Sequence, residues 1–382
     1  MGVIGLGNMG SSHCLQIHIH KKVPGLELGA VCDTSAERRE WASGSLPGVP
    51  VFENATDMYK SGLIDAVLIA VPHYDHPSLA IEAFAYGLHV LVEKPAGVYT
   101  KQVLEMNAAA ERSDAVFGIM YNQRTNPVYQ KVRDLVHSGE LGGIKRAVWI
   151  VTDWYRSQAY HDSGSWRSTW AGEGGGTLIN QNPHNLDLWQ WILGMPKTIR
   201  SFVGYGKYYD IEVEDDVTAY MEFANGASGV YITSTGELPG TNRLEISGDM
   251  GKIVVEHNEI AFYRNRISER EHNRTNTKPF GRVECWKCAI PVDKNSGEQH
   301  IGIMKNFTNA ILRGEQLLAP GEEGINGLLI SNAIHYSSWT DSLVDVEKFD
   351  HDRFYELLQD KIANSKAKKN VVQQVADVAG TH

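Results

Sequence analysis

Short apolar runs alternate with helical segments through residues 1–122. Runs that are apolar at nearly every position are typical of strands buried on both faces. They lie at Val3–Ile4, Leu26–Cys32, Ala66–Val71, His89–Val92 and Ala115–Ile119. Helical patterns separate them, for example over Pro77–Tyr86 and Lys101–Arg112. Parallel strands need such crossovers, so the pattern predicts an α/β fold with a doubly wound parallel Rossmann sheet.

The pattern changes after a predicted helix over Asn126–Ser138. Strands then dominate, at Arg146–Thr152, Ile199–Tyr205, Val217–Phe223, Gly229–Thr235, Arg243–Ser247 and Lys252–Glu256. Further helices are predicted at His184–Leu193, Ile301–Arg313 and Glu323–Thr340. We therefore expect a C-terminal α/β domain with a large, open, mostly antiparallel sheet and helices on one face. The predicted units are residues 1–122, residues 123–345, and a C-terminal helix and tail over 346–382, frayed or packed on a partner from about Asn364.

Composition and charge narrow the class of protein. The chain has 382 residues, of which 42% are hydrophobic, and a net charge of −10, which argues against nucleic acid as a partner. No apolar stretch approaches the ~20 residues of a membrane span. The chain opens on Met1–Gly5 without a signal-peptide pattern, and four cysteines are too few for a disulfide framework. We therefore expect a cytoplasmic protein with no membrane partner.

A glycine-rich turn follows the first predicted strand. It has the spacing G-x-G-x-x-G and consists of Gly5, Leu6, Gly7, Asn8, Met9 and Gly10. Asp33 follows Gly10 by 23 residues, close to the ~20 expected of a dinucleotide site. The turn and the helix N-terminus suit a pyrophosphate, and Asp33 suits the adenosine ribose. Asp33 favours NAD, whereas Arg38 nearby keeps NADP open; the alternative is a glycine turn without a ligand.

A lysine stands at the end of the strand His89–Val92, in the sequence Glu93-Lys94-Pro95. Ligands of open α/β sheets bind outside the carboxyl ends of the strands, so Lys94 is expected at the cofactor crevice. A lysine there holds a substrate hydroxyl, and burial lowers its pKa toward a useful range. The alternative is a surface lysine that only ends a strand.

A second candidate lies in the stretch Gly174–Asp187, which begins with three glycines. Asn182 is placed to cap the following helix and Pro183 suits its first position. His184 then falls in the first turn, where the helix dipole disfavours protonation and leaves the imidazole able to act as a base. Asp187 is predicted on the same face. The alternative is a histidine that only packs or caps.

Together these motifs resemble the Gfo/Idh/MocA family, named for glucose–fructose oxidoreductase, inositol dehydrogenase and rhizopine catabolism. The resemblance covers residues 1 to about 345. It implies an NAD(P)-dependent oxidoreductase that transfers hydride between nicotinamide and a hydroxyl of a sugar, polyol or glycoside, with Lys94 and His184 catalytic. It also implies a cofactor contact for further residues at two strand ends, which are Val71, Pro72, His73, His76 and Glu93.

One position departs from the family pattern. Many members have Asp beside the histidine where this chain has Asn180. We assign Asn180 to the catalytic group with Lys94 and His184. An amide orients a neighbour but holds no charge, so the usual Asp–His pair is in doubt. Asp187, or the substrate, would then have to supply the negative charge.

An aromatic and basic cluster precedes the glycine triplet. Aromatic faces stack on sugar rings while polar groups bind hydroxyls, so we expect substrate contacts from Trp154, Tyr155, Arg156, Tyr160, Trp166 and Arg167, together with Asn180 and His184. The two arginines suit an acidic group on the substrate as well. The alternative is an aromatic core or a subunit interface.

No metal site is predicted. Cys285 and Cys288 lie three positions apart on a predicted strand and therefore face opposite ways. His13, His18 and His20 have no shared helical face and are interpreted as solvated or structural.

Three functions and one assembly remain to be tested. Besides the dehydrogenase, the same motifs suit a glycosidase that uses NAD by transient oxidation and elimination, or a non-catalytic ligand sensor. We also expect a homodimer or homotetramer, formed through an exposed sheet face that carries apolar residues such as Val217, Tyr231 and Ile246.

Overall fold

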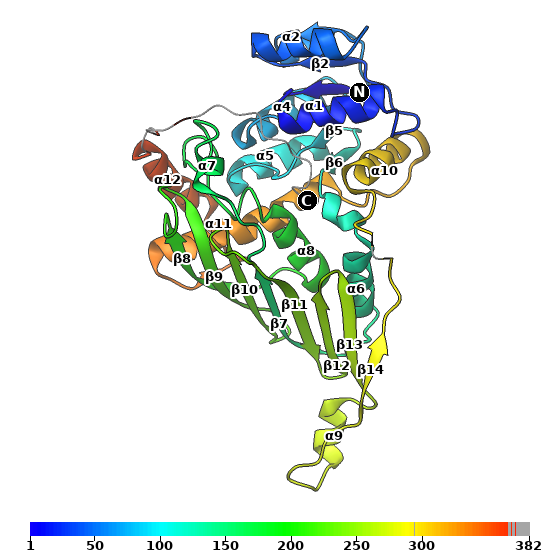
Figure 1. Cartoon of the computed structure of the whole chain (residues 1–382), viewed down its shortest axis with the longest axis vertical. Helices are drawn as coiled ribbons and strands as arrows, with labels where there is room; N and C mark the ends of the chain where they lie inside the picture. The colour runs from blue at the N-terminus through cyan, green and yellow to red at the C-terminus, as the bar shows by residue number, and fades with distance from the viewer. Residues whose placement is uncertain (294, 366–367, 369–370, 372–382) are drawn as a thin grey trace.

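In the computed structural model, which describes residues 1–293, 295–365, 368 and 371, the N-terminal half contains a parallel sheet (Figure 1). Its six strands have the order β3-β2-β1-β4-β5-β6. The strands are β1 (Gly2–Ile4), β2 (Ala30–Cys32), β3 (Val51–Phe52), β4 (Ala66–Ile69), β5 (His89–Val92) and β6 (Phe117–Ile119). The order reverses between β1 and β4, and this confirms the predicted Rossmann fold.

Helices cross over between these strands. They are α1 (Asn8–Cys14), which continues as η1 (Leu15–Ile19), α2 (Ala36–Ser45), α3 (Ala55–Lys60), η2 (His73–Asp75), α4 (His76–Ala85) and α5 (Thr100–Glu111). The sequence fixes where two of them begin, because the Ser35 side chain accepts from the Arg38 N–H and that of Asn54 from the Asp57 N–H.

The second sheet has nine strands in the order β14-β13-β12-β11-β7-β10-β9-β8-β15. They are β7 (Ile144–Val151), β8 (Thr198–Tyr205), β9 (Glu214–Glu222), β10 (Ser228–Ser234), β11 (Asn242–Gly248), β12 (Gly251–Glu256), β13 (Glu259–Asn265), β14 (Cys285–Ala289) and β15 (Val344–Asp345). Every pair is antiparallel except β7 and β10, which run parallel. The predicted large, mostly antiparallel sheet is therefore confirmed.

Helices pack on one face of this sheet and against the Rossmann domain (Figure 1). The helices that follow β6 are η3 (Asn122–Thr125), α6 (Pro127–His137), α7 (Gln158–His161), α8 (Pro183–Leu193), α9 (Glu269–Thr275), α10 (Gln299–Arg313), η4 (Gly321–Glu323), α11 (Gly324–Thr340) and α12 (His351–Ala363). Of these, α9 has no buried residue and lies beyond the end of the sheet (Figure 1). Among the described residues, no helix is both long enough and apolar enough to cross a membrane.

The face assignment of three sheet residues was wrong. Val217, Tyr231 and Ile246 are fully buried, and the Tyr231 ring packs against the Trp189 ring of α8 at 5.8 Å. They therefore lie on the face that the helices cover. The opposite face carries Phe202, which is 67% exposed, and Tyr220, which is 42% exposed. Side chains alternate along a strand, so a shift of one position moves a residue to the other face.

A late segment of the chain, at Ala319 and Pro320, pairs with the edge of the Rossmann sheet. The Ile119 N–H donates to the Ala319 carbonyl at 3.1 Å, and Gly118 forms a bridge with Pro320. Helix α12 then packs on α5, where the Thr100 hydroxyl lies 2.7 Å from the His351 ring. The boundaries at residues 122 and 345 stay predictions, and most of the predicted tail lies outside the described residues.

Candidate active site

The glycine turn between β1 and α1 is shaped by close approaches of the backbone. A side chain on Gly5 (φ +85°) would come within 2.6 Å of the Ala70 carbonyl oxygen, and one on Gly10 within 1.8 Å of the Gly5 carbonyl oxygen. At Gly7, in contrast, an added Cβ would meet no atom within 4 Å. No side chain caps α1, so its first N–H groups are available above this open position. Asn8 and Met9 form that first turn, and the whole arrangement fits a pyrophosphate.

Asp33, which follows β2, and Arg38, in the first turn of α2, lie beside this turn. The Asp33 carboxylate accepts from the Leu6 N–H at 2.7 Å and from the Ser35 N–H at 2.8 Å. The Arg38 guanidinium donates to the Leu6 carbonyl at 2.6 Å. Both charges therefore bind the main chain of the same residue, Leu6, on either side of its Cα atom. The adenosine ribose of a dinucleotide lies beside this turn in Rossmann folds.

Lys94 stands at the end of β5 and reaches into the second domain. Its ammonium group donates to the Asn180 carbonyl at 2.9 Å, and the side chain is half-buried. Burial lowers the pKa of Lys94, the nearby charges of Glu93 and Glu173 raise it, and those of Arg156 and Arg167 lower it further. The net result is a pKa below the ordinary lysine range, which suits proton transfer.

Glu93 joins α1 to the end of β5. One carboxylate oxygen lies 2.6 Å from the ring of the buried His13 on α1, and the other accepts from the Lys94 N–H at 3.1 Å. Burial alone would raise the pKa of Glu93, but the His13 hydrogen bond and the neighbouring cations lower it to about 2. The pair holds α1 to the strand end that carries Lys94, so the structural interpretation of His13 applies.

His73 and His76 follow β4 and are both buried. The two His76 ring nitrogens lie 2.8 Å from the carbonyl oxygens of Val71 and Pro95, which joins the ends of β4 and β5. His73 faces the second domain, 3.2 Å from the Glu173 carbonyl, and burial lowers its pKa to about 3. Of this group, Val71 is half-buried and Pro72 is exposed.

The glycine triplet is held by Glu214, a residue that sequence reasoning missed. Its buried carboxylate accepts from the Gly176 N–H at 2.8 Å and from the Leu178 N–H at 2.9 Å. Burial raises the pKa of Glu214 to about 8. No local pattern around residue 214 indicated this, because the contact depends on the return of β9 to the triplet.

Helix α8 places His184 in its first turn, as predicted, but Asn182 does not cap it. Asn182 occupies the cap position without a side-chain bond to the helix. Its side chain donates to the Thr177 hydroxyl at 2.8 Å and accepts from the Tyr231 hydroxyl at 2.6 Å. These contacts fix the entry to α8, and the buried His184 ring lies edge-on to Tyr121, with ring centres 6.3 Å apart.

Asp187 is not a partner of His184. Its carboxylate forms a two-pronged ion pair with the buried Arg124, at 2.6 and 2.8 Å, and accepts from Gln190 at 3.0 Å. Arg124 also donates to Glu323 at 2.6 Å. Helical spacing correctly predicted that Asp187 lies on this helix. Its carboxylate is paired, however, with a guanidinium group that is distant in the sequence.

The negative charge beside Asn180 comes from Glu173, which immediately precedes the glycine triplet. The Asn180 amide donates to one Glu173 carboxylate oxygen, and the Ser168 N–H donates to the other at 2.6 Å. Glu173 is 2% exposed, and burial raises its pKa while the charge of Arg167 lowers it. An acidic residue adjoining the triplet was the available sequence signal, and it was missed.

The aromatic loop contributes some of its predicted residues to this site. Asn180 and Arg167 both donate to the Tyr160 hydroxyl, and the Trp166 ring lies edge-on to His73 with ring centres 6.2 Å apart. Arg156 stacks on the Tyr160 and Trp154 rings. Tyr155 is exposed.

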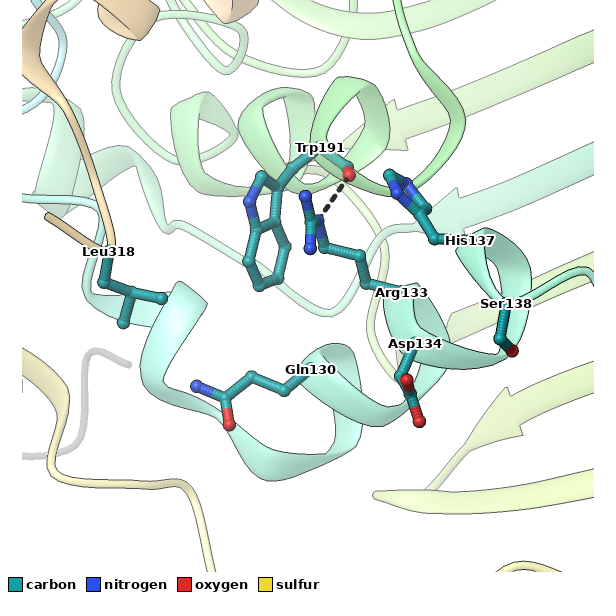
Figure 2. A pocket seen from close by; sticks show the side chains of 7 residues that line it. All are labelled: Gln130, Arg133, Asp134, His137, Ser138, Trp191 and Leu318. Atoms are coloured by element: carbon teal, nitrogen blue, oxygen red, sulfur yellow. Dashed lines mark hydrogen bonds between the residues drawn. The ribbon is translucent and has the colours of Figure 1, made fainter. Parts of the chain in front are cut away.

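A separate hollow of about 500 Å³ lies on α6 (Figure 2). It is lined by Gln130, Arg133, Asp134, His137, Ser138, Trp191 and Leu318. It contains none of the predicted site residues. Within the described ranges, no cluster of three or more His, Cys, Asp or Glu side chains is arranged to hold a metal ion.

The strand ends of the dinucleotide-binding domain lie next to a lysine, a histidine and a buried carboxylate. This combination defines a Rossmann-type oxidoreductase. Comparison with known protein families supports this class of protein. Residues 1–121 match the oxidoreductase family with an NAD-binding Rossmann fold, and residues 129–254 match the GFO/IDH/MocA C-terminal domain. The chain belongs to the Gfo/Idh/MocA family and has an NAD-binding Rossmann domain.

Individual relatives place it within this family. It is 31% identical to the rhizopine catabolism protein MocA of Rhizobium meliloti, over 52% of this chain and 58% of that protein. It is 25% identical to levoglucosan dehydrogenase of Pseudarthrobacter phenanthrenivorans, over 91% of this chain and 97% of that protein. The WlbA dehydrogenase of Bordetella pertussis, solved with NADH and UDP-GlcNAcA, is 25% identical with a TM-score of 0.74, covering 90% of this chain and 97% of that one.

Proposed function

We propose that this protein is an NAD-dependent dehydrogenase of a sugar, polyol or glycoside hydroxyl. The observation that carries the proposal is Lys94, a lysine of lowered pKa at the end of β5, bonded to the Asn180 carbonyl of the facing domain. Levoglucosan dehydrogenase and the inositol 2-dehydrogenase of Corynebacterium glutamicum, 32% identical over 59% of this chain, support the substrate class.

In this proposal, NAD would supply the hydride acceptor for oxidation of the hydroxyl to a carbonyl. The glycine turn would hold its pyrophosphate and Asp33 its ribose, and Val71 and Pro72 would lie toward its nicotinamide end. Glu93 and His76 position the strand ends from behind. Lys94 takes the hydroxyl proton, and His184 orients that hydroxyl or shares the proton.

The test is a panel of sugars, polyols and glycosides with NAD, read by NADH absorbance. Net NADH formation supports the dehydrogenase. Release of free sugar from a glycoside at constant NADH supports the redox-assisted glycosidase instead. Binding of a sugar without either reaction supports the ligand sensor.

We propose that Glu173 positions Asn180 and supplies the charge that an Asp at position 180 supplies elsewhere in the family. Glu173→Gln keeps one acceptor oxygen for the Asn180 amide and removes the charge. Because that charge raises the pKa of Lys94, and lysine is a base only above its pKa, the acid limb of kcat/KM for oxidation should move to lower pH by about 1 unit, equivalent to ~1.4 kcal/mol.

The matched variant returns the carboxylate to position 180. Glu173→Gln combined with Asn180→Asp should bring the acid limb back toward that of the native protein. Asn180→Asp alone is a poorer test, because two carboxylates in contact share a proton. A limb that is unmoved in both variants would show that Glu173 does not couple to the base.

We expect NAD to be preferred over NADP by at least about 10-fold in kcat/KM. That ratio requires only ~1.4 kcal/mol, and like charges 4 Å apart repel by ~4 kcal/mol at an effective dielectric of about 20. Asp33→Asn should narrow the ratio. Equal or better use of NADP by the native protein would refute the role of Asp33 and point to Arg38.

We expect a homodimer or homotetramer formed through the open face of the second sheet. The face carries exposed Phe202 and Tyr220 beside Arg200 and Thr218, and exposed apolar groups of this kind mark interfaces. Light scattering at micromolar concentration should give at least a dimer, and Phe202→Lys should weaken it; a native monomer would reject the assembly.

We also propose a cytoplasmic location, since Cys14, Cys32, Cys285 and Cys288 are all free.

A further inference from the structure

Too many hydrogen-bond donors converge on the Tyr160 hydroxyl. Arg167 donates to it at 3.0 Å, Gln181 at 3.2 Å and Asn180 at 3.3 Å. A hydroxyl oxygen has two lone pairs, so these donors exceed what it accepts well. These excess hydrogen-bond donors lie in the proposed substrate region, next to Asn180, which accepts from Lys94. A ligand rich in acceptor oxygens would satisfy them.

Positive charge is in surplus at the same place. The guanidinium groups of Arg156 and Arg167 both lie over the Tyr160 ring, at 5.1 and 4.8 Å from its centre, and both side chains are half-buried. Their hydrogen-bond partners in the described part of the chain are neutral oxygens, those of Tyr155 and Tyr160. The carboxylate near these two arginines is that of Glu173, which accepts a hydrogen bond from the Asn180 amide.

The cations at this place favour an anion. Arg156, Arg167 and Lys94 are three cations near the Glu173 carboxylate, so positive charge exceeds negative charge here. Lys368, a further cation near Glu173, has Asp162 and Glu212 as acidic neighbours of its own. A guanidinium fork also fits a carboxylate with two parallel hydrogen bonds.

We propose that the substrate is a sugar acid, whose carboxylate is received by Arg156 and Arg167 above Tyr160. The proposal rests on the proposed dehydrogenase function and narrows its substrate class. The carboxylate stays unchanged in the reaction. It binds one end of the molecule so that a hydroxyl elsewhere on the same molecule reaches Lys94.

The experiment compares acids with their neutral counterparts. kcat/KM with NAD is measured for D-glucuronate against D-glucose, D-galacturonate against D-galactose, and D-gluconate against D-sorbitol, with D-glucose 6-phosphate as the phosphate arm. At least one acid should exceed its counterpart by about 10- to 100-fold, the range for hydrogen bonds to a charged group. Arg156→Met and Arg167→Met should each shrink that ratio.

Arg133→Met is the matched control, because Arg133 also stacks on an aromatic ring, that of Trp191 at 4.7 Å, but lies in the hollow on α6 (Figure 2). It should leave the acid-to-neutral ratio unchanged. Should the site variants fail to fold, the ratio of the native protein decides alone.

The outcomes separate the two proposals. Neutral sugars oxidised as well as the acids would overturn the acid proposal and leave the dehydrogenase intact, and so would a preference for the phosphate. If no compound yields NADH, the dehydrogenase fails on this panel. Binding is then read by tryptophan fluorescence: saturable quenching by an acid and not by its counterpart, weakened in Arg156→Met, sustains the carboxylate site, and no such difference overturns it.

Discussion

Lys94→Ala is expected to lower kcat for oxidation by about 10²- to 10⁴-fold, the usual contribution of a well-placed proton-transfer group. NAD binding should change little, because we propose that the glycine turn and Asp33 hold the opposite end of the cofactor. The native acid limb should lie below the ordinary lysine value of ~10.4, since burial lowers the pKa of Lys94. Steady-state kinetics and NAD titration of both proteins give the comparison.

Lys94→Arg is the matched control for this experiment. Arginine keeps a positive charge and donors toward the Asn180 carbonyl, but it does not lose its proton in proteins. If Lys94 acts as the base, the arginine variant stays as slow as the alanine variant. An alanine variant that retains more than about a tenth of the native rate would place Lys94 outside the reaction path.

Asp187→Asn is expected to destabilise the protein by about 3 kcal/mol, the lower end of the range for breaking a buried ion pair. Arg124 is buried and would lose its two-pronged partner while Glu323, 40% exposed, still neutralises part of its charge. Urea denaturation gives the change in the free energy of unfolding.

A second measurement on this variant separates structure from catalysis. Because Asp187 pairs with Arg124 and not with His184, the pH dependence of kcat/KM should keep its acid limb. Replacing both partners, as in Arg124→Met with Asp187→Leu, should cost less stability than Asp187→Asn, because no charge is left buried without a partner. A stable Asp187→Asn protein with a shifted limb would restore Asp187 as the charge partner of the histidine.

The sequence was sufficient for the fold because its signals are local. Apolar strands, the glycine turn and the strand-end Lys94 follow from periodicity and from the geometry of parallel sheets. The face of a strand was a weaker inference. Tyr231 and its neighbours were assigned to the wrong side because alternation shows which residues share a face, and only the packed helices show which face is covered.

The candidate site was predicted less completely because its connections are distant in sequence. Helical spacing placed Asp187 correctly on α8 but gave no information on Arg124, which comes from η3. The same limit hid Glu214, which reaches the glycine triplet from β9. Glu173 lies close to Asn180 in sequence, yet the contact depends on how the glycine triplet turns the chain back.

The bridge between Gly118 and Pro320 affects how a fragment of this chain would behave when it is produced alone. β6 is the last strand of the parallel sheet, and an unpaired strand edge invites pairing with other chains. Here that edge is covered by Ala319 and Pro320. A fragment cut after residue 122 would expose the backbone of β6, so the nucleotide-binding unit needs the late part of the chain as protection against aggregation.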